Sequence, residues 1–167
     1  MSKKQKRILV DMACSVLHHG HIRILKKAYK LGVHLFAFDC EEELLKIGEA
    51  APRSSVYCRL EVDNGGAEWP LSKKFGCCEK ELEYLLIKAK RIGLNPIGLS
   101  FHVGSQQLSK KTWEKAIKVS SNIYKKFKKK HFELNFLNIG GGMPVDYDNK
   151  KIDFKNYAKN IINLIDR

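Results

Sequence analysis

The sequence of 167 residues has few arginines, no CxxC cysteine pair and no long apolar run near its N-terminus. The apolar stretch there, residues 8–10, is too short for a signal-peptide core or a membrane span. Five cysteines without a CxxC spacing are typical of a protein from a reducing compartment. We therefore expect a cytoplasmic protein with no membrane partner.

Arginine supplies only six of the 31 basic residues, although the net charge is +13. Clustered basic residues neutralise nucleic-acid phosphates, but bidentate recognition of phosphates and guanine edges favours arginine over lysine. The lysines are also dispersed along the chain, which is typical of solvated helix faces. We expect no nucleic-acid partner, and a basic nucleic-acid-binding protein remains the alternative from another functional class.

Motifs of several common enzyme classes are missing. No Gly-Lys-Ser/Thr follows a glycine run, so there is no Walker loop, and the glycines lack the spacing of a dinucleotide fingerprint. Neither a nucleophile elbow nor paired catalytic carboxylates stand out. His18, His19 and His21 form a cluster, but Cys14 is the only soft ligand nearby, so we expect no metal site.

What the sequence does contain is an alternation of short strand-like runs with longer helical periodicities. The predicted strands are residues 8–13, 35–39, 56–62, 97–103 and 136–139. Between and after them, apolar residues recur at helical spacing near residues 21–31, 44–47, 82–89, 113–127 and 154–165. This alternation predicts a parallel α/β fold, with units of roughly 33 residues, the size of βα repeats in barrels and doubly wound sheets.

Parallel α/β folds bind ligands at the carboxyl ends of their strands, and three predicted strand ends carry unusual residues. Arg59 is costly to bury, which predicts an anionic partner or a structural ion pair. His102 precedes a small-residue loop that contains Ser105; it is either a ligand-binding imidazole or a hydrogen-bonded core histidine. Gly140, Gly141 and Gly142 are either an anion-binding loop or a tight turn.

The order of several motifs is also informative. They are FDC at 38–40 with Glu43 and Leu44, VYCRL at 56–60, KFG at 74–76, GLSFHVGSQ at 98–106 and LNIGGGMP at 137–144. In this order the motifs resemble the ornithine/diaminopimelate/arginine decarboxylase family. The resemblance implies a pyridoxal phosphate (PLP) enzyme with an alanine-racemase-like barrel and a second β domain. It covers the chain from about residue 8 to the end.

The resemblance also implies roles for individual residues. His102 would stack on the pyridine ring of PLP, Ser105 and the amides of Gly140, Gly141 and Gly142 would hold its phosphate, and Arg59 would lie near the ring. The implied reaction is decarboxylation of a small-molecule basic amino acid, ornithine-type, as in polyamine biosynthesis. A homodimer is expected of the full-length family member, and Lys74 lies in the segment that approaches the partner subunit.

Parts of the family pattern are missing from the sequence. The family's Schiff-base lysine closes an early strand in a context like Tyr-Ala-x-Lys, whereas the first strand here runs into Met12-Ala13-Cys14-Ser15. The family's general-acid cysteine belongs to a C-terminal β domain that we also expect to be absent, so we assign no catalytic residue.

We therefore interpret residues 1–7 as a basic leader and residues 8–167 as a partial (β/α)8 TIM-type barrel of about five βα units. As a fragment or truncated form, it is expected to be inactive alone. A non-catalytic PLP-binding barrel and a degenerate remnant remain alternatives.

Overall fold

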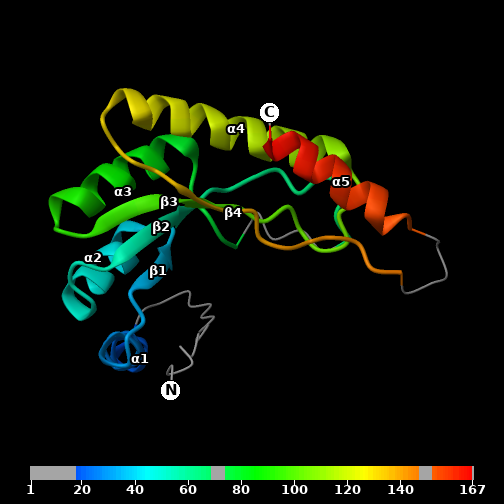
Figure 1. The fold of residues 1–167 in the computed structure, drawn as a ribbon. Helices are drawn as coiled ribbons and strands as arrows, with labels where there is room; N and C mark the ends of the chain where they lie inside the picture. Colours follow the sequence, from blue (N-terminus) through cyan, green and yellow to red (C-terminus); the bar gives the residue numbers. More distant parts are fainter. Residues whose placement is uncertain (1–17, 69–73, 147–151, 167) are drawn as a thin grey trace, which may run out of the picture.

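A computed structural model describes residues 18–68, 74–146 and 152–166 of the chain (Figure 1). The predicted leader, residues 1–7, and the predicted first strand, residues 8–13, lie outside the described residues. Helices and strands alternate in the described part, and their bounds are α1 (His19–Lys30), β1 (Leu35–Phe38), α2 (Glu41–Ala50), β2 (Ser55–Arg59), α3 (Glu79–Arg91), β3 (Asn95–Ser100), α4 (Lys110–Lys129), β4 (Phe136–Asn138) and α5 (Phe154–Ile165).

The four strands form one parallel sheet in the order β1-β2-β3-β4, which is also their order in the chain. Right-handed crossovers between strands placed in sequential order put the connecting helices on one face of the sheet. A doubly wound sheet would reverse its strand order at a switch point, and this sheet does not. The arrangement confirms a parallel α/β fold of consecutive βα units, as in part of a (β/α)8 barrel.

The hydrophobic core lies between the sheet and its helices. Phe38, Cys58 and Leu99 are aligned in neighbouring strands, and each is at most 2% exposed. Helix α3 packs on β2 and β3 through a buried stripe that repeats every three or four residues, namely Leu82, Leu85, Leu86 and Ala89. Neighbouring helices also contact each other, α1 with α2, α2 with α3, and α4 with α5 (Figure 1).

The lysines of helix α4 lie on the side of the helix that faces the solvent. Trp113, Ala116, Ile123 and Phe127 are buried along one side, while every lysine of this helix is exposed. The prediction that its lysines occupy a solvated helix face is therefore confirmed. None of the helices in the described ranges is long and apolar enough to cross a membrane.

The other face of the sheet is only partly covered in the described part of the chain. Ala37, Tyr57, Gly98 and Phe136 are aligned across the four strands, and their neighbours in each strand point to the helices. The rings of Tyr57 and Phe136 lie with centroids 4.9 Å apart. In a closed barrel the corresponding face is the packed interior.

The predicted element boundaries differ from the structure by a few residues, and three of these differences have a local cause. Helix α1 begins at His19, earlier than predicted, because His18 caps it: its Nδ1 accepts a hydrogen bond from the Gly20 amide, and His21 Nδ1 accepts one from the His18 amide. Strand β2 ends at Arg59, because Leu60 pairs instead with Cys77 of the following segment. Strand β3 ends at Ser100, shortly before the positive-φ turn at Gly104.

Candidate functional site

The residues predicted at the three strand ends lie on the same side of the sheet. Arg59 is aligned with Ser100 and Asn138 at the ends of β2, β3 and β4. His102 lies two residues after Ser100, and Gly140 lies two residues after Asn138. Residues two apart along an extended chain point to the same side. The sheet therefore brings Arg59, His102 and the glycine run to the same edge, as the sequence predicted.

His102 is held as a neutral imidazole. The Gly104 amide donates a hydrogen bond of 3.0 Å to His102 Nδ1, so the ring proton is on Nε2. Partial burial lowers the pKa of His102, and the positive charge of Arg59 lowers it further. The backbone is fixed as well, because His102 O accepts a hydrogen bond of 3.0 Å from Asn64 Nδ2.

Two of the three glycines are required by the packing of their loop on the segment around His102. A Cβ on Gly140 would lie 2.3 Å from Phe101 O, and one on Gly142 would lie 2.0 Å from Gly104 O. Both also have positive φ, 69° and 101°. Any side chain at these positions would push the glycine loop away from the end of β3.

The amides of the glycine run are not equivalent. Gly140 donates a hydrogen bond of 2.8 Å to Asn138 Oδ1, so this amide already has an acceptor. Among the described residues, nothing accepts a hydrogen bond from the amides of Gly141 and Gly142. A Cβ on Gly141 would lie 3.3 Å from His102 Nε2, which places this glycine beside the imidazole ring. The loop thus combines a tight turn with two amides suited to an anion.

The loop after β3 is bound to the glycine loop by hydrogen bonds. The Gln107 amide donates to Gly142 O at 2.8 Å, and the Gln106 side chain pairs with both the amide and the carbonyl of Val145, at 2.8 and 2.9 Å. Ser105 is exposed in this loop. These bonds fix the spacing between the His102 loop and the glycine loop.

Arg59 is half-buried, not fully buried as its apolar strand suggested. The reason is the strand alternation: Cys58 and Leu60 face the core at 0% and 2% exposure, while Arg59 faces the open side. Its guanidinium carbon lies 4.6 Å from the ring centroid of Phe75. Sequence reasoning did not find this contact, because Phe75 lies in the long connection between β2 and α3.

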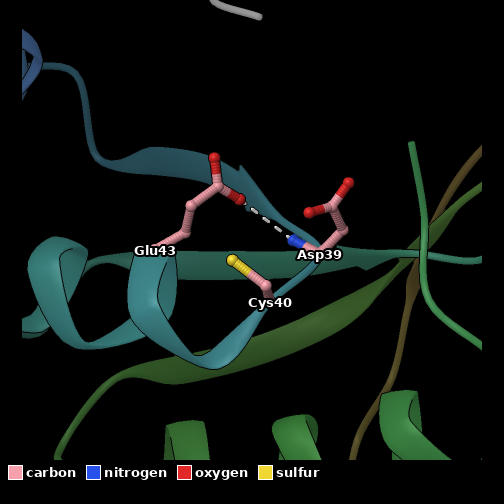
Figure 2. A group of neighbouring side chains, drawn as sticks. All are labelled: Asp39, Cys40 and Glu43. Carbon is pink, nitrogen blue, oxygen red and sulfur yellow. Dashed lines mark hydrogen bonds between the residues drawn. The ribbon is translucent and has the colours of Figure 1, made fainter. Parts of the chain in front are cut away.

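A cluster of Asp39, Cys40 and Glu43 follows β1 (Figure 2). Glu43 Oε2 accepts a hydrogen bond of 3.2 Å from the Asp39 amide, and Asp39 Oδ2 accepts one of 2.8 Å from the Gly76 amide. Burial raises the pKa of Glu43, and the charge of Asp39 raises it further. Asp39 thus anchors the segment that carries Phe75, a contact that the sequence did not predict.

The family model described as "Pyridoxal-dependent decarboxylase, pyridoxal binding domain" matches residues 10–167. The chain belongs to this family. Its relatives include the lysine/ornithine decarboxylase of Selenomonas ruminantium, 36% identical over 87% of this chain and 37% of the relative. Mouse (Mus musculus) ornithine decarboxylase is 35% identical over 75% of this chain and 27% of the relative.

Solved structures agree with this assignment. A crystal structure of an SrLDC mutant in complex with PLP matches with a TM-score of 0.82 at 36% identity, over 86% of this chain and 38% of that chain. The chain thus spans between about a quarter and two fifths of the length of these relatives. The predicted family and the partial barrel are confirmed.

Proposed function

We propose that this chain is the cofactor-holding part of a PLP-dependent decarboxylase that acts on a basic amino acid of the ornithine type. The family match and the names of its relatives support the reaction class. The observation that carries the proposal is local. A neutral His102 ring lies beside Gly141, at the strand ends that also carry Arg59.

The residues present fit PLP, a phosphorylated aromatic molecule. The amides of Gly141 and Gly142 and the exposed hydroxyl of Ser105 are the donors we assign to its phosphate. We assign the face of His102 to its pyridine ring, because a neutral imidazole stacks without adding a second positive charge beside Arg59. When bound, PLP supplies the electron sink for loss of the carboxylate.

Arg59 supplies a fixed positive charge at the open edge of the site. The Phe75 ring restricts the guanidinium group, and the Asp39–Gly76 hydrogen bond holds the backbone next to Phe75. Burial is the larger cause of the lowered pKa of His102, and the charge of Arg59 adds to it; the same charge attracts anionic ligands to the strand ends.

The lysine that would join the cofactor covalently has no counterpart in this sequence, so we assign these residues to binding alone. Turnover and substrate choice then require the remainder of a family member. A full-length family member is expected to be a homodimer, and Lys74, which is exposed here, lies in the segment that approaches the partner subunit in the family.

Binding of PLP to the purified chain, measured by equilibrium dialysis, tests the proposal. We expect His102→Ala and Arg59→Gln each to weaken binding by roughly tenfold, the effect of losing one stacking or charge contact. Arg91→Gln is the matched control, because Arg91 is exposed at the end of α3. Equal losses in Arg59→Gln and Arg91→Gln would mean that only net charge matters.

Release of carbon dioxide from ornithine, lysine or diaminopimelate is the second measurement. We expect none above background from the 167-residue chain alone, with or without added PLP. Turnover by this chain would contradict the assignment of its residues to binding only.

A further inference from the structure

Two buried cysteines from separate parts of the chain lie in contact. Cys58 Sγ in β2 is 3.6 Å from Cys77 Sγ, which follows 19 residues later, just before α3. Cys58 is 0% exposed and Cys77 is 4% exposed. Neither thiol has a role in the site described above.

The backbone explains why the two sulfurs meet. The Cys77 amide donates to Arg59 O at 3.0 Å, and the Glu61 amide donates to Cys77 O at 2.9 Å, so Cys77 is paired with Leu60 as in a parallel sheet. Cys77 therefore points to the same face as Leu60 and, two residues earlier, Cys58. A hydrogen bond from the Cys77 thiol to Arg59 O, 3.5 Å long, orients its sulfur further.

The other cysteines of the described part lie in different surroundings. Cys40 lies half-buried with Asp39 and Glu43, and Cys78 is exposed at the start of α3. No other contact between two thiols is found among residues 18–68, 74–146 and 152–166. The pairing is thus specific to Cys58 and Cys77.

We propose that Cys58 and Cys77 are a redox-active pair that closes to an intramolecular disulfide when it reacts with a small-molecule disulfide of the glutathione class. The sulfurs lie 3.6 Å apart, and Cys77 is paired with Leu60 rather than with Cys58, so closing the bond requires the backbone of residues 74–78 to shift along β2 as well as rotation of the two side chains. This proposal does not depend on the proposed function, since it concerns neither PLP nor a substrate.

The exchange occurs in two steps. The deprotonated sulfur of Cys77, the less buried of the two, attacks one sulfur of glutathione disulfide; a mixed disulfide forms and one glutathione thiolate leaves. Burial raises the pKa of the Cys58 thiol, so Cys58 gives its proton to the departing glutathione as its sulfur attacks the Cys77 sulfur and displaces the second glutathione. The two cysteines lose two electrons and two protons, and glutathione disulfide takes up both to become two glutathione thiols.

The disulfide would fix the segment that positions Phe75. Cys77 is two residues after Phe75 and one after Gly76, whose amide is bound to Asp39. A covalent bond from Cys77 to β2 adds to these contacts and holds the Phe75 ring over Arg59. The oxidised form is therefore expected to open less often between β2 and residues 74–78.

The test uses the wild-type chain in glutathione buffers of increasing oxidised fraction. Free thiols are alkylated, and the digested protein is mapped by mass spectrometry without reduction. We expect a peptide pair joined through Cys58 and Cys77, lost on reduction, while Cys40 stays alkylated. Full alkylation of Cys58 and Cys77 in the most oxidising buffer, or bonds only between other cysteines, would overturn the proposal.

Hydrogen exchange provides a second readout. In the oxidised wild type, the amides of Gly76, Cys77 and Glu61 should exchange about tenfold more slowly than in the reduced protein. Cys58→Ala should abolish this difference, whereas Cys40→Ala is the matched control and should keep it. If Cys58→Ala fails to fold, Cys77→Ala replaces it in the exchange experiment, and the peptide map of the wild type still shows whether the Cys58–Cys77 disulfide forms. An unchanged exchange rate on oxidation would contradict the fixing of residues 74–78.

Discussion

The guanidinium group of Arg59 lies over the ring of Phe75, with 4.6 Å between the guanidinium carbon and the ring centroid. The contact joins the end of β2 to the segment that precedes α3, 16 positions further along the chain. Cation–π contacts contribute about 0.5–2 kcal/mol depending on exposure, and both residues here are half-buried. The Phe75 ring thus contacts the charged group that lowers the pKa of His102.

Replacing Phe75 tests this contact. Phe75→Leu keeps an apolar side chain but removes the ring, so we expect a loss of about 1 kcal/mol in the free energy of unfolding by urea. We also expect a loss of a few fold in PLP affinity, because Arg59 is less well positioned. Phe75→Tyr keeps the ring and is expected to behave like the wild type. If both variants lose affinity equally, the ring face is not what holds the guanidinium.

The pKa of His102 can be followed directly by NMR titration of its imidazole protons. Burial and then the charge of Arg59 lower this pKa from the ordinary value of about 6.5. In Arg59→Gln the charge is gone but the burial remains, so the pKa should rise part of the way toward 6.5. A pKa of His102 that is unchanged by Arg59→Gln would show that the two side chains do not interact electrostatically.

The same shift predicts how stability depends on pH. Because the pKa is lower in the folded chain, the unfolded chain binds more protons between the folded pKa and about 6.5. The free energy of unfolding should therefore rise with pH through this window, and its His102 contribution should be lost as pH falls through it. His102→Asn should flatten this part of the profile, whereas His131→Asn, at an exposed position, should leave it unchanged.

The sequence predicted the alternation of elements well because each element carries its own signal. The apolar residues of helix α3 from Leu82 to Ala89 recur at helical spacing, and the strands are short runs rich in β-branched and aromatic residues. Parallel α/β folds bind ligands at the carboxyl ends of their strands, and this rule placed Arg59, His102 and the glycine run together before it was known which strands are neighbours in the sheet. Local patterns and one topological rule were enough for this part.

The contacts of residues 74–78 could not be predicted in the same way. Phe75 over Arg59, Gly76 on Asp39 and Cys77 on Cys58 all arise because a segment without a periodic pattern returns to the strand ends. Nothing local in the sequence specifies where such a segment goes. The hydrogen bond from the Gly140 amide to Asn138 Oδ1 could not be predicted either, because it depends on how the Asn138 side chain is oriented.

Gly98 is expected to be intolerant of any side chain. A Cβ at this position would lie 1.7 Å from the backbone oxygen of Phe136, so β3 and β4 would have to separate. We expect Gly98→Ala to lower the free energy of unfolding by about 3 kcal/mol or more. Gly48→Ala is the control: its Cβ would meet only the flexible end of Ile92, at 3.2 Å, within helix α2. Similar effects of the two changes would contradict the close approach of β3 and β4.

The hydroxyl of Tyr157 joins α5 to α4 and to the loop after β3. It accepts a hydrogen bond of 2.7 Å from Trp113 Nε1 and donates one of 2.5 Å to Gln107 O. Trp113 is completely buried, so Tyr157→Phe leaves an indole N–H without its acceptor. We expect a loss of about 1–3 kcal/mol in the free energy of unfolding, the usual cost of a buried unpaired donor.

Tyr84→Phe is the matched control for this loss, because Tyr84 is 49% exposed and its hydroxyl donates to Glu41 on the surface. Loss of the Tyr84 hydroxyl should change the free energy of unfolding by no more than about 1 kcal/mol, because water replaces it as the partner of Glu41. A double-mutant cycle of Tyr157→Phe with Trp113→Phe isolates the bond between the two side chains. A coupling near zero would show that the loss in Tyr157→Phe comes from Gln107 alone, and that α5 is attached through the loop rather than through α4.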